Sequence, residues 1–163
     1  MRPEVLPFPE GTVAMFTWVF YGMRPRMDDR LKILDLTPIQ FMVLGSLRQS
    51  GGLSAAELSR HFGVTYQTMG EIVKKLKRRS FITRARSIPG RRGFRLGLTR
   101  VGREALRTGE RAIEVLENEV FSEMPAQDRE TLCELLLRLH DRLGLQCDLD
   151  GAAIQTTWSA PSE

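Results

Sequence analysis

The sequence predicts a mainly helical protein that carries one small β-hairpin. Helix-start signals follow one another closely at Thr37, Ser54 and Thr65. Two short alternating runs separated by a turn come next, and a long amphipathic segment begins behind Thr99. With 163 residues, of which 42% are hydrophobic, the chain is long enough and apolar enough for the core of one domain.

The N-terminal part divides into an arm and a helix. Residues 1–11 contain three prolines and predict an irregular arm. An apolar and aromatic segment from Thr12 toward Leu31 predicts a helix, with a kink or break at Pro25. Its apolar surface is almost continuous, so we expect burial on most sides, and a chain of this size needs a partner chain to cover it.

Two capping boxes mark the next helices. Thr37 and Gln40, with a proline between them, open the first of these helices. Ser54 and Glu57 repeat the pattern for a short helix, which Gly63 can end in a left-handed conformation. The sequence therefore predicts two helices joined by a short connection.

Thr65 is a cap candidate for a third helix, which is followed by a hairpin. Apolar residues fall on one face of this helix, namely Met69, Ile72, Val73 and Leu76. Polar residues fall on or near the opposite face, namely Tyr66, Gln67, Gly70, Glu71, Lys74 and Lys75. Residues 81–86 and 94–98 then predict two strands, and the turn between them carries Arg91 and Arg92.

The C-terminal part predicts two longer helices. Thr99 caps the first, and Pro125 begins the second, which Gly144 ends. Leucines in the second helix have the spacing of a helix–helix seam, at Leu132, Leu135, Leu136, Leu139 and Leu143. Residues 145–163 predict a weakly ordered tail.

Positive charge is concentrated in one part of the chain. The segment from Glu71 to Arg100 has eleven basic residues and one acidic residue, a net charge of +10. The rest of the chain has 13 basic and 19 acidic residues, a net charge of −6. This asymmetry favours a polyanionic partner, and the alternative is a merely solvated basic surface.

Two helices joined by a tight turn and followed by a basic hairpin form a winged helix-turn-helix, which predicts double-stranded DNA as the partner. The second helix of the pair is slim enough for the major groove. Its polar residues can read or position base edges, namely Thr65, Tyr66, Gln67 and Glu71. Basic residues along it can meet phosphates, namely Lys74, Lys75 and Arg78, while Arg91 and Arg92 can reach the minor groove.

Four segments together resemble the MarR-type transcriptional regulators: Leu36–Leu44, Leu53–Arg79, Arg91–Gly93 and Leu96–Gly102. The resemblance implies a homodimer on a pseudo-palindromic operator, and in many members release of the DNA by a small aromatic or phenolic acid. Other members sense oxidants through cysteine. It also implies a helical dimerisation region (12–35 and 99–144) and a winged DNA-binding lobe (36–98). An alternative is a dimeric winged-helix interaction module without ligand sensing, which acts through a protein partner or binds DNA non-specifically.

The chain departs from the family pattern at particular positions. Gly90 replaces the aspartate that braces the wing, and Ser80 replaces the glycine behind the reading helix. If Ser80 keeps the left-handed conformation, that costs about 1 kcal/mol. Gly70 and Glu71 stand where a hydroxyl and a basic residue are common. Glu71 can accept from cytosine or repel phosphate.

An effector site would involve Trp18, Tyr21 and Arg24, since aromatic rings and a guanidinium suit an aromatic acid. The alternatives are dimer core for the aromatic residues and surface pairing of Arg24 and Arg26 with the aspartates that follow. For the cysteines we expect plain packing at Cys133 and an idle thiol at Cys147, because acidic neighbours disfavour the thiolate.

Several classes of protein are disfavoured. The longest apolar run, nine residues from Val13 to Tyr21, is too short to span a membrane, and the N-terminus lacks a signal-peptide layout. We therefore expect a cytoplasmic protein. No Cys/His spacing predicts a metal site, and no phosphate loop or nucleophile elbow predicts an enzyme or a cofactor.

Overall fold

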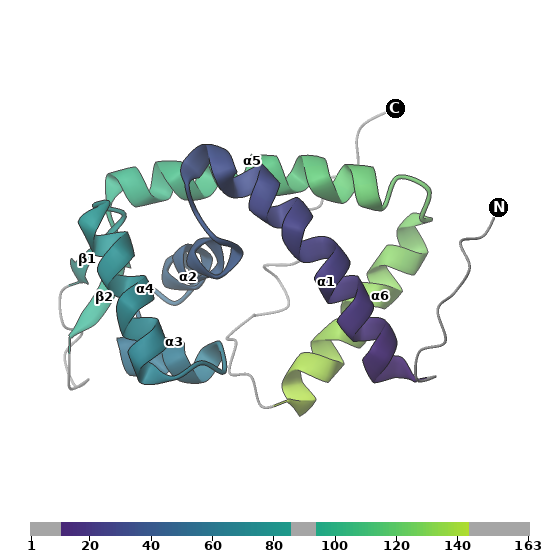
Figure 1. Ribbon diagram of the computed structural model, residues 1–163, viewed down its shortest axis with the longest axis horizontal. Helices are drawn as coiled ribbons and strands as arrows, with labels where there is room; N and C mark the ends of the chain where they lie inside the picture. Colours follow the sequence, from purple (N-terminus) through teal and green to yellow (C-terminus); the bar gives the residue numbers. More distant parts are fainter. Residues whose placement is uncertain (1–10, 86–93, 144–163) are drawn as a thin grey trace.

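The computed structural model describes residues 11–85 and 94–143. These residues form six α-helices, one short 3-10 helix and a two-stranded antiparallel sheet (Figure 1). In chain order the elements are α1 (Thr12–Leu31), η1 (Lys32–Leu34), α2 (Pro38–Gln49), α3 (Ala55–His61), α4 (Tyr66–Arg78), β1 (Ile82–Ala85), β2 (Arg95–Leu98), α5 (Arg100–Val120) and α6 (Ala126–Arg142).

The first helix runs through its proline. The sequence predicted a kink or a break at Pro25. α1 extends as one helix from Thr12 to Leu31, so a break is wrong, while a kink stays a prediction. Proline removes a single backbone hydrogen bond, and α1 packs against both α2 and α5, which hold it in place. Leu31 is fully buried at the C-terminal end of this helix.

Both predicted capping boxes are present. The Thr37 hydroxyl accepts from the Gln40 backbone N–H at 3.4 Å, and the Gln40 side chain accepts from the Thr37 N–H at 3.1 Å. Ser54 and Glu57 make the same reciprocal pair at 3.2 and 2.7 Å. Gly63 has the expected left-handed conformation, with φ of +60°. These caps fix where α2 and α3 begin and how the chain turns into α4.

The hairpin is confirmed, but the sheet extends further than the sequence predicted. β1 and β2 pair antiparallel, with Ile82 opposite Leu98. On the other side of β2, Leu53 exchanges two backbone hydrogen bonds with Leu96, at 3.2 and 2.8 Å. Leu53 is a single residue between two helices, and one residue shows no alternation from which a strand could be predicted.

The start of α5 is fastened to the end of the winged lobe. The Thr99 hydroxyl accepts from the Gly102 N–H at 3.0 Å, which confirms the predicted cap. Gly102 lies so close to the strand that an added Cβ would stand 1.9 Å from the Phe81 carbonyl oxygen. Only glycine fits this contact, so the first turn of α5 can pack directly on the Phe81 backbone.

One core joins the winged lobe to α5. Its fully or almost fully buried members are Leu31, Val43, Leu44, Leu47, Leu58, Met69, Leu76 and Leu106. Figure 1 shows α5 running from this lobe to the side where α1 and α6 extend away from it. Among the described residues, α6 has none that is buried, and only Leu31 of α1 is.

Apolar side chains therefore remain uncovered in the single chain. On α1 they are Val13, Met15, Phe16, Trp18, Val19, Phe20 and Tyr21, and on α6 they are Leu135, Leu136 and Leu139, with Leu143 directly after the helix. The burial expected for α1 is not achieved within one chain. No helix in the described ranges is long and apolar enough to cross a membrane.

Candidate nucleic-acid interface

α4 separates its residues cleanly into two faces. Met69, Ile72, Val73 and Leu76 are buried against the lobe, as the sequence predicted. Seven of the nine residues predicted to meet DNA belong to α4 or its cap, and all seven are exposed, namely Thr65, Tyr66, Gln67, Glu71, Lys74, Lys75 and Arg78. The fold thus brings these seven residues together on one helix and leaves them open to solvent.

The first turn of α4 carries one more hydroxyl than the sequence analysis singled out. Thr65 caps the helix by accepting from the Thr68 N–H at 3.1 Å. Its hydroxyl also lies 2.8 Å from that of Thr68, which is exposed beside Gln67. Thr68 could have been named as a candidate DNA contact, because it lies in the first turn of the helix and outside the set of apolar residues that form the buried face.

Glu71 does not stand alone on the exposed face. Its carboxylate lies 4.0 Å from the Lys74 ammonium, and the two side chains are 63% and 65% exposed. A pair this open to solvent contributes little to stability. It can separate at small cost, which leaves Lys74 available to an incoming phosphate.

Two arginines of the basic segment turn inward. Arg79 reaches the connection between α1 and α2, and Arg95 is only 5% exposed inside the winged lobe. Both contribute to the charge of +10 in this segment, but Arg95 is withdrawn from the surface and Arg79, whose side chain is 35% exposed, is engaged by the protein. A run of charge does not reveal on which side of a strand or helix end each residue lies.

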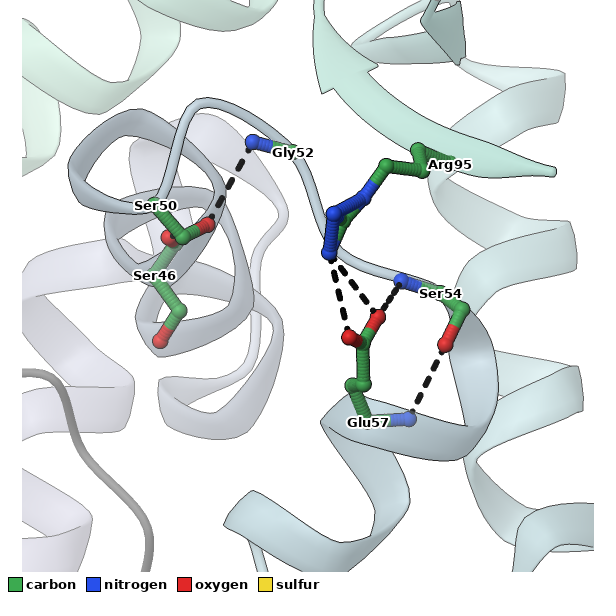
Figure 2. A network of polar contacts seen from close by, with 6 residues as sticks. All are labelled: Ser46, Ser50, Gly52, Ser54, Glu57 and Arg95. Carbon is green, nitrogen blue, oxygen red and sulfur yellow. Dashed lines mark hydrogen bonds and ion pairs between the residues drawn. The ribbon is translucent and has the colours of Figure 1, made fainter. Parts of the chain in front are cut away.

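Arg95 forms an ion pair with Glu57 of α3 (Figure 2). Its Nη2 donates to both carboxylate oxygens of Glu57, at 3.1 and 3.2 Å. Glu57 also caps α3 through Ser54, so one carboxylate ties β2 to the start of α3. Within the described part of the chain, Nε and Nη1 of Arg95 are buried and lack a hydrogen-bond partner. The wing is therefore held to α3 by an ion pair whose guanidinium is almost fully buried and whose carboxylate is partly exposed.

The same contacts set the ionisation of Glu57. The hydrogen bond from the Ser54 backbone N–H lowers the pKa of this carboxyl below its ordinary value of 4.5. Burial opposes the effect, while the Ser54 hydroxyl and the Arg95 guanidinium lower the pKa further.

The chain before the bridge residue Leu53 is also held by hydrogen bonds. The Ser50 hydroxyl donates to the Ser46 carbonyl at 2.7 Å and accepts from the Gly52 N–H at 3.4 Å (Figure 2).

The stem of the wing carries an exposed aromatic residue. The Arg84 guanidinium stacks over the Phe94 ring, 4.0 Å from its centroid, and Phe94 is 71% exposed. This pair holds a cation at the end of the two strands that is nearer the turn. Periodicity does not reveal this pair, because Arg84 lies in β1 and Phe94 directly precedes β2. Arg91, Arg92 and Gly90 lie outside the described residues.

Ser80 adopts the left-handed conformation expected of the glycine that it replaces in the family pattern. Its φ is +56°, in the turn between α4 and β1. The Ser80 N–H donates to Lys77 and the Phe81 N–H donates to Leu76, at 2.9 and 3.0 Å. These two bonds close the end of α4 and hold the turn at a cost of about 1 kcal/mol relative to glycine.

The candidate effector residues are accessible on α1. Trp18 is 49% exposed, Tyr21 is 63% exposed and Arg24 is exposed. In the described ranges neither Arg24 nor Arg26 forms an ion pair with the aspartates that follow, so the expected pairing is wrong. The Arg26 guanidinium instead donates to the Gly22 carbonyl at 2.7 Å.

Cys133 is exposed on α6, which contradicts the expected packing within one chain. The spacing that predicted a helix seam places it among exposed leucines that no other described element covers. Cys147 lies outside the described residues. Among those described, no group of three His, Cys, Asp or Glu side chains could hold a metal ion.

Known proteins share this sequence pattern and this fold. A family model described as "MarR family" matches residues 34–93. The chain is 32% identical over 117 residues to the HTH-type transcriptional repressor Rv2887 of Mycobacterium tuberculosis, covering 72% of this chain and 84% of that protein. The HTH-type transcriptional repressor Mb2911 of Mycobacterium bovis matches with the same identity and the same coverage.

Solved structures agree with this likeness. The crystal structure of the M. tuberculosis MarR family protein Rv2887 in complex with salicylic acid is 29% identical, with a TM-score of 0.66, over 82% of this chain and 99% of that one. Apo MarR from E. coli is 22% identical, with a TM-score of 0.67 and coverage of 83% and 98%. BldR from Sulfolobus solfataricus is 24% identical, with a TM-score of 0.71 and coverage of 80% and 92%. The last two show the fold alone.

The lowered pKa of Glu57 predicts how acid affects the winged lobe. Its stabilisation is present above pH 4.5 and is lost as the pH falls through the lower pKa of the folded state. The Glu57→Gln variant should have a lower free energy of unfolding at pH 7, because it loses the charge that pairs with Arg95. The loss should be only about 1 kcal/mol, because the carboxylate is partly open to solvent. The difference from the wild type should shrink toward pH 3.

Urea unfolding followed by circular dichroism at several pH values measures this difference. Glu71→Gln is the matched control, because it removes an exposed carboxylate with one weak ion pair and should change stability little. A Glu57→Gln deficit of the same size at pH 3 and pH 7 would contradict the assignment.

Proposed function

The chain belongs to the MarR family of transcriptional regulators, and we propose that it is a homodimeric repressor that binds a pseudo-palindromic DNA operator and releases it when a small aromatic acid binds. The observation that carries this proposal is the exposed polar and basic face of α4, in a lobe whose wing strand β2 is tied to α3 by the Arg95–Glu57 pair. The related Rv2887 protein is named an HTH-type transcriptional repressor, which supports the same use of this fold.

Different turns of α4 can make different kinds of contact with DNA. Tyr66, Gln67 and Thr68 occupy its first turn, where hydroxyl and amide groups can meet base edges in the major groove. Lys74, Lys75 and Arg78 follow in the later turns, where their cations can meet phosphates on either side. Arg91 and Arg92 remain the candidates for minor-groove contact at the tip of the wing.

The uncovered apolar surface supports a second copy of the chain as partner. Exposed apolar residues crowd α1 and α6, which extend on the side away from the winged lobe (Figure 1). Contiguous apolar surface of this kind marks an interface in soluble proteins. A two-fold axis there would present two copies of α4 to half-sites about one turn of DNA apart.

The exposed face of α1 supports an aromatic acid as effector. Trp18, Tyr21 and Arg24 follow one another at intervals of three residues and therefore share one side of the helix. Rings and a guanidinium can hold the ring and the carboxylate of such an acid. The related Rv2887 protein has been crystallised with salicylic acid and with p-aminosalicylic acid.

DNA binding is tested with the fragment just upstream of the protein's own gene and a scrambled fragment, each at two salt concentrations, by fluorescence anisotropy. The wild type should prefer the upstream fragment by about 10³-fold. Lys74→Ala should weaken binding to both fragments and lower the salt slope by about one, whereas Gln67→Ala should change the preference at one base step.

Arg138→Ala is the control for lost charge, since this exposed arginine lies on α6. It should leave the salt slope unchanged. Equal binding of the wild type to both fragments would contradict an autoregulatory operator and indicate phosphate contact alone.

Leu139→Lys should separate the dimer, because it places a charge in the apolar face of α6. We expect the dissociation constant to rise by about 100-fold or more, since an unpaired charge would be buried. Sedimentation equilibrium measures the change. Glu134→Lys adds the same lysine on the opposite side of α6 and should remain dimeric. A monomeric wild type at micromolar concentration would overturn the dimer.

Arg24→Ala should weaken the binding of sodium salicylate by about tenfold, because it removes the cation that would hold the carboxylate. Isothermal titration calorimetry measures this affinity, and anisotropy measures the release of DNA. Arg26→Ala is the control on the same helix, since Arg26 already donates to the Gly22 carbonyl. Equal salicylate affinity of the Arg24→Ala protein and the wild type would remove Arg24 from the site.

A further inference from the structure

Arg79 directly follows α4 but does not join its exposed polar face. Its Nη2 donates to the Leu34 carbonyl at 2.7 Å, and its Nη1 donates to the Asp35 carbonyl. The Asp35 carboxylate lies 3.5 Å from Nη1. The guanidinium also covers the Phe81 ring, 4.6 Å from its centroid. Arg79 is therefore held on several sides by the protein itself.

The partners of Arg79 belong to the connection between α1 and α2. Leu34 ends η1, and Asp35 follows it in a left-handed conformation with φ of +48°. The last carbonyls of a helix lack donors from their own helix. The planar fork of a guanidinium can satisfy two neighbouring carbonyls at once, which the single ammonium of lysine does less well. Arg79 thus caps the end of η1.

The residues next to Arg79 hold α5. Thr99 donates its hydroxyl hydrogen to the Ser80 carbonyl at 2.6 Å, and its N–H bonds the Phe81 carbonyl at 3.0 Å. Gly102 packs on the same Phe81 carbonyl. The segment from Arg79 to Phe81 therefore joins three parts of the molecule: the α1–α2 connection, the end of α4 and the start of α5.

We propose that Arg79 is a positioning residue for specific DNA binding, which fixes the reading helix α4 to the connection that leads from α1. This inference rests on the proposed DNA-binding function and deepens it. Arg79 acts through the placement of α4 and does not bind phosphate. A displacement of α1 relative to the lobe is passed to α4 through this contact.

The alternative role for an arginine in a basic segment is a phosphate contact, and the two roles have different signatures. A phosphate contact contributes about one unit to the salt dependence and acts equally on all DNA sequences. A positioning residue changes the ratio of specific to random binding and leaves the salt slope unchanged. The guanidinium of Arg79 is already occupied by carbonyls and by a ring, which favours the second role.

The experiment compares Arg79→Met, Arg79→Lys and Arg78→Met in the full chain, with folding checked by circular dichroism. Arg78 is the matched control, because it is the exposed preceding residue on α4. Arg79→Met should weaken binding to the upstream fragment by about tenfold and leave random binding and the salt slope unchanged. Arg79→Lys keeps the charge and should lose part of the specificity. Arg78→Met should weaken both fragments and reduce the slope.

Amide hydrogen exchange of the free protein tests the contact without DNA. Arg79→Met should speed exchange at Leu36, whose N–H bonds Leu31, and at Ser80 and Phe81. Arg78→Met should not. Unchanged exchange in Arg79→Met, or a salt slope reduced as in Arg78→Met, would overturn the proposal. A wild type without DNA preference would refute the proposed operator binding, while the exchange result would still decide whether Arg79 joins the two segments.

Discussion

The close contact between the first turn of α5 and the Phe81 carbonyl determines how the whole chain is arranged. A Cβ at Gly102 would overlap that oxygen, so the helix can approach the strand only because the position is glycine. Thr99 adds hydrogen bonds to the same turn. Since α5 then extends to the side where α1 and α6 lie (Figure 1), this contact sets the direction of the helical region relative to the winged lobe.

The basic segment serves two purposes that its composition does not separate. Lys74, Lys75 and Arg78 stay exposed along α4, whereas Arg79 binds carbonyls of the α1–α2 connection and Arg95 is buried. A buried guanidinium is costly unless it is paired, and Glu57 supplies the charge that pairs Arg95. This pair gives orientation more than stability, because it fixes where the hairpin lies against α3. The surface that faces DNA in the proposed function is thus aligned by charges that never reach it.

Local signals made much of the fold predictable. The caps at Thr37, Ser54, Thr65 and Thr99 act through neighbours in sequence, and each begins a helix as expected. Contacts between distant residues were not predictable in this way. The Leu53 bridge, the Arg95–Glu57 pair and the Arg84–Phe94 stack depend on tertiary packing, which periodicity does not encode.

The same distinction applies to the candidate site and to α1. The exposed face of α4 follows from helical periodicity around Met69 and Leu76, so its members could be named from the sequence. The inward turn of Arg79 could not, because its partners Leu34 and Asp35 are more than forty residues away. At Pro25 a local signal allowed a break that does not occur, since α1 packs against α2 and α5 and the loss of one hydrogen bond does not end the helix.

The distribution of burial links folding to the proposed function. The winged lobe and the adjoining part of α5 share a continuous core, whereas the apolar residues of α1 and α6 are largely uncovered in one chain. In the proposed homodimer, association would stabilise the helical region and would depend on protein concentration. It would also make the second half-site contact intramolecular, so that two modest contacts give tight operator binding. An effector on α1 would then act on a helix that takes part in the dimer and that leads, through η1, to the connection held by Arg79.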